Sequence, residues 1–463
     1  MMMAFRHIAL FVLLWVIAPG WEGNAGTVQV TEEDGRAGLL QEHVDAARPG
    51  DSILVAEGRY HGNLLVSKRL SLIGSRGAVL LGNGTGSVVT ITADSCELSG
   101  FSIENSGIML AEEDAGIMVQ SGRNHIRGNQ LSDILFGIYL WGADSNIVSG
   151  NTVTGKAQLG LGQRGSGIHI YNSVSNRFVG NRISDMRDGF YILYANNSYI
   201  EGCEVFNVRY GLHYMYADSN IFIGNSFHDN IAGAAIMYSN GIQMFRNEFR
   251  DNRGFSSYGI LFQDCHDLIA EYNVITDNTV GMFMESSTGN LFRANLIARN
   301  HIALQMFQNS TSNTFTENDF IENLSPLTIV GKSTGSIWSV QGRGNYWSSY
   351  DGYDLDGDGT GDVPMKIQNI FEYLEGQTPG VRLYLYSPAS QALAVAANSF
   401  PILDTSGEVD PHPLMRPAVK DMIFTSPENA MTDGGVEAGW PLFPAIGFLI
   451  GGVAYYKLSR KQR

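Results

Sequence analysis

Residues 181–246 read NRISDMRDGFYILYANNSYIEG, CEVFNVRYGLHYMYADSNIFIG and NSFHDNIAGAAIMYSNGIQMFR, which are three consecutive blocks of 22 residues. Each block carries a glycine eight residues after its first position, followed by alternating apolar residues. The first position is asparagine in the outer two blocks and Cys203 in the middle one. Short strands that repeat at this period are typical of a parallel β-helix. We therefore predict an all-β chain, a right-handed parallel β-helix with rungs of about 22 residues.

The repeat extends well beyond these blocks. Its asparagine column comprises Asn129, Asn151, Asn181, Asn225, Asn247, Asn273, Asn295 and Asn318. Its glycine column comprises Gly116, Gly137, Gly167, Gly189, Gly211, Gly233, Gly259 and Gly281, and Ala303 takes the next place. Extra residues around 156–164 and 254–257 lengthen two rungs and predict loops there.

The asparagine column suits a turn between stacked strands. Strands this short cannot bury a face alone, so neighbouring rungs must stack about 4.8 Å apart. An asparagine side chain bonds to nearby backbone groups, tolerates a left-handed backbone and can bond to the asparagine above it. Aspartates recur four residues later and follow the repeat instead of gathering in one place. We interpret them as turn residues and not as a catalytic row: Asp133, Asp185, Asp229, Asp251 and Asp277.

The segments flanking the repeat predict a cap and an extension. Residues 39–62, LLQEHVDAARPGDSILVAEGRYHG, indicate a short amphipathic helix, a Pro-Gly-Asp turn and then the first strand. Such a helix would cover the open end of the stack, where strand groups are unpaired. We expect the β-helix to occupy residues 26–342, an extension to occupy 343–422, and a linker to occupy 423–439.

Both termini carry apolar segments that predict targeting. Residues 1–25 have a positive start, an apolar stretch from Ile8 to Ala18 and small residues before a cleavage point, which is typical of a signal peptide. Residues 440–456 are apolar and precede a basic tail at 457–463, which predicts a transmembrane helix with a cytoplasmic tail. A buried or interfacial helix is the alternative for this span. We expect the main body outside the cytoplasm.

Composition excludes some function classes. The formal net charge is −16, whereas phosphate binding needs a basic surface, so we expect no nucleic-acid partner. The three cysteines are far apart in sequence and odd in number, which favours buried thiols over a disulfide framework or a zinc site.

An acidic loop follows the repeat. Within GNYWSSYDGYDLDGDGTGDVPM, residues 344–365, four aspartates occupy positions 1, 3, 5 and 9 of a calcium-loop spacing: Asp354, Asp356, Asp358 and Asp362. The twelfth position is Met365, so the usual bidentate glutamate is missing. The segment predicts a structural Ca²⁺ site, and a solvated acidic turn is the alternative.

Period-two alternation after each glycine predicts which side chains point outward. The expected outward set is rich in aromatic residues, histidine and methionine, and it lacks the paired carboxylates of a glycosidase, so the surface does not predict a glycosidase. Imidazole and thioether donors suit Cu(I), and the candidate copper ligands are His213, Met215 and Met237, with His169 two rungs away. The alternative is a hydrophobic docking patch, which is the commoner use of such a surface.

The chain resembles the NosD family. The likeness is carried by residues 40–62, the rungs, NYWSSYDGYDLDGDGTGDVP, SPASQALAVAANSF and DPHPLMRP, and it extends to about Met422. The resemblance implies a periplasmic protein without enzyme activity that docks on an ABC permease with its ATPase. It implies a role in copper delivery to nitrous oxide reductase, with the reductase and a copper chaperone as partners. The runner-up is an extracytoplasmic β-helix that binds or cleaves carbohydrate.

Overall fold

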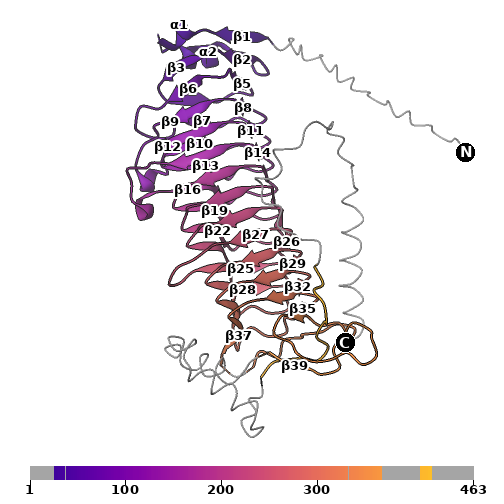
Figure 1. Ribbon diagram of the computed structural model, residues 1–463. Coiled ribbons are helices and arrows are strands. Elements are labelled where there is room, and N and C mark those ends of the chain that lie inside the picture. Colours follow the sequence, from indigo (N-terminus) through magenta and orange to yellow (C-terminus); the bar gives the residue numbers. More distant parts are fainter. Residues whose placement is uncertain (1–25, 37, 332, 368–406, 420–463) are drawn as a thin grey trace, which may run out of the picture. The chain divides into compact units, whose positions relative to one another are not determined.

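The protein is described by a computed structural model that covers residues 26–36, 38–331, 333–367 and 407–419. These residues form a right-handed parallel β-helix, in which each turn of the chain passes through three sheets (Figure 1). Strands pair in parallel with the strands of neighbouring rungs; Leu212, for example, pairs with Ala234, which is 22 residues further along the chain. The predicted right-handed parallel β-helix is confirmed.

The first sheet has thirteen strands. In stacking order they are β1 (Thr27–Val30), β2 (Ser52–Val55), β5 (Ser71–Gly74), β8 (Glu97–Ser99), β11 (His125–Arg127), β14 (Ile147–Ser149), β17 (Arg177–Val179), β20 (Tyr199–Glu201), β23 (Ile221–Ile223), β26 (Gln243–Phe245), β29 (Ile269–Glu271), β32 (Leu291–Arg293) and β35 (Thr314–Thr316).

The second sheet has twelve strands and carries the candidate metal ligands. They are β4 (Leu64–Val66), β7 (Val89–Ile91), β10 (Ala115–Val119), β13 (Phe136–Trp141), β16 (Ser166–Tyr171), β19 (Asp188–Leu193), β22 (Tyr210–Met215), β25 (Ala232–Asn240), β28 (Tyr258–His266), β31 (Val280–Glu285), β34 (Ile302–Phe307) and β37 (Ser325–Val330).

The third sheet has thirteen strands, and its last one lies beyond residue 342, the predicted end of the helix. They are β3 (Gly58–His61), β6 (Ala78–Leu81), β9 (Ser102–Glu104), β12 (Gln130–Ile134), β15 (Thr152–Gly155), β18 (Arg182–Ser184), β21 (Glu204–Phe206), β24 (Ser226–His228), β27 (Glu248–Arg250), β30 (Val274–Thr276), β33 (Leu296–Ala298), β36 (Asp319–Ile321) and β38 (Tyr346–Trp347).

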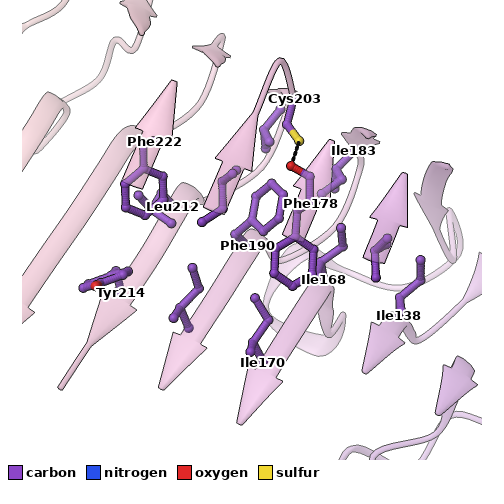
Figure 2. Close-up of a cluster of buried hydrophobic side chains, with 14 of the residues drawn as sticks. Ile138, Ile168, Ile170, Phe178, Ile183, Phe190, Cys203, Leu212, Tyr214 and Phe222 are labelled. Atoms are coloured by element: carbon purple, nitrogen blue, oxygen red, sulfur yellow. Dashed lines mark hydrogen bonds between the residues drawn. The ribbon is translucent and has the colours of Figure 1, made fainter. Parts of the chain in front are cut away.

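The core is a continuous apolar column inside the three sheets. Period-two alternation sends Ile168 and Ile170 of β16 inward, where both are fully buried. Figure 2 shows how such residues of the second sheet meet Phe178 and Phe222 of the first. Burying each large apolar side chain contributes roughly 1.5–3 kcal/mol, so the rungs are held mainly by this column. The cysteines Cys96, Cys203 and Cys265 are buried free thiols, as predicted.

The asparagine column forms a buried hydrogen-bonded ladder. The side-chain Nδ2 of Asn129 donates to Oδ1 of Asn151 at 3.0 Å, and the backbone N–H of Asn129 donates to the same oxygen at 3.0 Å. At the gap, the ladder partner of Asn181 Nδ2 is the Sγ of Cys203, at 3.9 Å, while Nδ2 also donates to the backbone C=O of Val148 at 2.8 Å. Two further asparagine ladders, which sequence reasoning missed, lie at other corners. One runs through Asn124, Asn146, Asn176 and Asn220, with Ser198 between the last two, and resumes at Asn290 and Asn313; the other contains Asn230, Asn252, Asn278, Asn300 and Asn323.

The column asparagines do not themselves adopt the left-handed backbone that asparagine tolerates. The left-handed residue is the one before each of them, such as Gly180 (φ 59°) or Gly224 (φ 62°). Where this residue is glycine, it adopts the conformation without steric cost; Arg246, Tyr272, Ala294 and Glu317 adopt it before the later asparagines. The five recurring aspartates do have left-handed φ values between 51° and 59°, so their interpretation as turn residues is confirmed.

Helices α1 (Glu32–Arg36) and α2 (Leu40–Ala46) lie at the N-terminal end, beside β1 to β3 (Figure 1). The first strand precedes them, contrary to the predicted order, because β1 pairs with β2. From α2, Gln41 bonds to both the N–H and the C=O of Leu65 on β4, the end strand of its sheet. These contacts are what a capping helix would make, and its capping role stays a prediction. Two single-turn 3₁₀ helices, η1 (Leu110–Glu112) and η2 (Leu161–Gln163), lie in loops between the third and second sheets; η2 falls in the predicted insertion.

At the other end, residues 407–419 fold back onto the last rungs, and β39 (Met365–Lys366) pairs antiparallel with β40 (Val409–Asp410). Buried carboxylates fix this segment. Asp410 accepts from the backbone N–H of Asn345 at 2.7 Å and from Trp347 Nε1 at 3.0 Å. Glu408 accepts from Trp338 Nε1 at 2.8 Å, and Asp319 accepts from the backbone of Ala418 at 2.7 Å. The Asp410 carboxylate thus occupies the place of the next asparagine in the ladder.

The predicted targeting segments lie outside the described residues, namely the signal peptide at 1–25, the span at 440–456 and the tail at 457–463. So does most of the linker. Among the residues that the structure describes, no helix has the length and apolar character needed to cross a bilayer.

Candidate metal centre

The outward side chains of the second sheet form two rows, called here the outer stripe. The first row comprises Tyr139, His169, Tyr191, His213, Ala235, Leu261 and Phe283. The second comprises Trp141, Tyr171, Leu193, Met215, Met237, Gln263 and Glu285. Burial alternates along β16, β19 and β22, so that the predicted inward residues are buried and the outward ones are partly exposed. The predicted phase of the strands is confirmed.

Three of the four candidate copper ligands are neighbours. Met215 and Met237 are register partners on β22 and β25, so their Cβ atoms lie about 5 Å apart. His213 lies on the same face of β22, two residues before Met215 and therefore roughly 6.6 Å along the strand. All three side chains are partly exposed. Flexible thioether side chains can close such gaps, so the arrangement can present two sulfurs and one nitrogen to a soft cation.

The imidazole of His213 is fixed in orientation. Its Nδ1 lies 3.2 Å from Oδ2 of Asp188 on the neighbouring strand. Its ring meets those of Tyr191 and Tyr210 edge-on, with ring centroids 4.7 Å and 5.2 Å away. Asp188 is fully buried. Arg209 donates two hydrogen bonds to it, from Nε to Oδ1 at 2.9 Å and from Nη2 to Oδ2 at 2.7 Å. Burial acts to raise the pKa of Asp188, but hydrogen bonds from His213 and Arg209 outweigh it and hold that pKa below the ordinary 3.8.

His169 is not brought together with the other candidate ligands. It lies two rungs from His213, and the Tyr191 ring lies between them. Its imidazole is sandwiched between Tyr139 and Tyr191 at centroid distances of 4.2 Å and 4.4 Å. Burial lowers the pKa of His169 to about 3, and its Nδ1 makes no hydrogen bond. His169 is thus a neutral ring within an aromatic stack.

The acidic loop brings together three of its four predicted ligands. Carboxylate oxygens of Asp354, Asp356 and Asp358 lie within 4.8 Å of one another. The backbone N–H of Gly359 and that of Gly357 donate to Asp354 and lower its pKa. Asp362 lies outside this group, and it accepts a hydrogen bond from the backbone N–H of Leu355 at 2.6 Å. The Ca²⁺ site stays a prediction, now for three carboxylates.

Sequence reasoning missed Asp188 and Arg209. A signal was present, because the residue before the column glycine is uncharged in every other rung from Ala115 to Val280. An isolated carboxylate at a position that is otherwise apolar or hydroxylic indicates a specific polar partner.

The comparisons with known proteins cover most of the chain. A family model described as "Periplasmic copper-binding protein (NosD)" matches residues 154–352. The "Probable ABC transporter binding protein NosD" of Pseudomonas aeruginosa is 36% identical over 383 residues, covering 78% of this chain and 87% of that protein. The chain belongs to the NosD family. The NosD protein of Stutzerimonas stutzeri, which has the same description, is 30% identical over 381 residues and covers 78% and 85% of the two chains. The resemblance drawn from the sequence is confirmed.

Solved structures support the fold of this NosD-family chain. A family model for a right-handed β-helix region matches residues 69–231. The catalytic domain of an alpha-1,3-glucanase in complex with tetrasaccharides has a TM-score of 0.55 at 12% identity, covering 70% of each chain. The A-module of the mannuronan C-5 epimerase AlgE6 from Azotobacter vinelandii has a TM-score of 0.54 at 11% identity, covering 68% and 96%. Similarity at this identity shows the architecture alone. The two NosD relatives are named as binding proteins.

Proposed function

We propose that this chain is a copper-handling accessory protein of nitrous oxide reductase assembly, which acts outside the cytoplasm together with an ABC-type transporter. The family to which it belongs is described as periplasmic and copper-binding. Its relatives are named as probable ABC transporter binding proteins. These descriptions support copper as the cargo, the periplasm as the compartment and an ABC transporter as one partner.

The observation that carries the proposal is the grouping of His213, Met215 and Met237 on one open face. Two thioethers and one imidazole form a soft donor set without thiolate, which suits Cu(I) and would hold it loosely enough to pass it on. The permease with its ATPase, a copper chaperone and the reductase are the proposed partners. The apolar span at residues 440–456 would then hold the protein at the outer side of the membrane.

The test is complementation of a strain that lacks this gene. We expect the parent gene to restore copper content and N₂O reduction to the purified reductase. Met215→Leu with Met237→Leu should restore little, because leucine keeps volume but removes sulfur. The matched control replaces the buried core residues Met244 and Met284 with leucine and should complement fully. Normal copper loading of the reductase without the gene would reject the function. Full complementation by the outer-stripe double variant would reject the site alone.

A further inference from the structure

Asp188 is a buried carboxylate that contacts a side chain of the outer stripe, His213. It begins β19, and its register neighbours are Ser166 on one side and Tyr210 on the other. Removing a carboxylate from water costs several kcal/mol unless partners offset the loss. Arg209 supplies two of the hydrogen bonds in a planar, bidentate grip. Asp188 Oδ2 also lies 3.2 Å from Nδ1 of His213 and, more distantly, 3.7 Å from Nε of Arg187.

The chemistry of this contact decides which nitrogen of His213 carries the proton. An ionised carboxylate is only an acceptor, so the Nδ1 that faces it must be the donor. In a neutral imidazole the other nitrogen, Nε2, then has the free lone pair. Metal-binding histidines commonly have this arrangement, in which a carboxylate accepts the N–H of the nitrogen that does not bind the metal.

We propose that Asp188, held by Arg209, is a positioning residue that fixes His213 as the Nδ1–H tautomer and so presents Nε2 to Cu(I). This inference rests on the proposed copper function and adds two residues to its site. The rings of Tyr191 and Tyr210 limit rotation of the imidazole, and Arg209 also packs over the Tyr210 ring at 4.4 Å. The orientation of the His213 imidazole is therefore restricted by the Asp188 carboxylate, the Arg209 guanidinium and two tyrosine rings.

The experiment measures tautomer and copper affinity separately in the full-length protein. The tautomer of His213 is observed by NMR of ¹⁵N-labelled histidine, assigned with His213→Gln. The affinity is measured by anaerobic competition for Cu(I) with the chelator bicinchoninate. Asp188→Asn keeps the shape but gives His213 a neutral partner, so we expect loss of the uniform Nδ1–H tautomer. The expected loss of Cu(I) affinity is about 10–100-fold.

Two variants separate positioning from plain stability. Arg209→Lys keeps a cation and leaves the Asp188 carboxylate in place, so it should lower thermal stability yet retain the tautomer. Asp319→Asn removes a different buried carboxylate, on β36, and should change neither tautomer nor affinity. If Asp188→Asn leaves both tautomer and affinity as in the parent, the positioning role is refuted while the copper site stands. A parent that binds no Cu(I) refutes the site itself, and this inference with it.

Discussion

The end of the asparagine ladder offers a quantitative test of how the solenoid is closed. Asp410→Ala removes the carboxylate that accepts hydrogen bonds at the end of the ladder. Two buried donors are then left unpaired: the backbone N–H of Asn345 and the Nε1–H of Trp347. Both residues are at most 1% exposed, so water cannot replace the carboxylate without opening the structure. Each unsatisfied buried donor costs about 1–3 kcal/mol. The expected loss is therefore about 2–6 kcal/mol, localised at this end.

The assay must be local because a repeat protein does not unfold as one unit. Native-state hydrogen exchange should show reduced protection of Asn345 and Trp347 in Asp410→Ala, with unchanged protection in β1 and β2. Asp410→Asn retains one carbonyl oxygen that can face both donors, so it should lose mainly the 3.1 Å bond from the His412 N–H, which is worth about 1 kcal/mol. Equal protection in parent and Asp410→Ala, or equal losses in both variants, would refute the assignment of Asp410 as the ladder's last acceptor.

Four further predictions follow from other regions. In vitro, Met215→Leu with Met237→Leu should abolish Cu(I) binding at a stability cost below about 1.5 kcal/mol, measured by chelator competition and thermal melting; parent-like Cu(I) binding would leave the outer stripe as a docking surface. Chelation of Ca²⁺ should lower the melting temperature if the clustered carboxylates of the acidic loop hold the ion, and an unchanged Tm at zero and saturating Ca²⁺ would favour a plain acidic turn. Burial raises the pKa of Cys203 to about 11, so its thiol should resist alkylation at pH 8 until the protein unfolds; rapid labelling of the native protein contradicts this. Cys203→Asn should give Asn181 a full ladder partner and stabilise these rungs by about 1 kcal/mol, and a destabilised variant would show that the position no longer accepts asparagine.

The fold was predictable because the chain repeats. A 22-residue period with asparagine and glycine at fixed positions leaves few architectures, and the period-two alternation set the correct face for His213 and Met215. The second and third asparagine ladders lie five residues to either side of the first, as in the series Asn220, Asn225 and Asn230. They follow the same period and were open to the same reasoning.

Contacts between distant segments were not predictable in this way. Asn345 meets Asp410 across 65 residues, and no periodic signal connects the two positions. The separation of His169 from the other candidate ligands was visible as two rungs, but the sequence alone did not show that the Tyr191 ring would stack against it. The Asp188–His213 contact depends on side-chain direction at the start of a strand, which residue spacing does not determine.

The regular stacking of the second sheet also fixes distances along the axis of the β-helix. Six strands lie in order from β22 to β37, and five intervals of about 4.8 Å place His213 and Met215 about 24 Å from the last strand of that sheet. Because each rung touches only its neighbours, this distance is a countable number of equal steps and not the outcome of a flexible hinge. Gain or loss of whole 22-residue rungs during evolution would change the distance between the candidate copper ligands and the end of the β-helix in fixed steps. The donor atoms would keep their mutual geometry at every length.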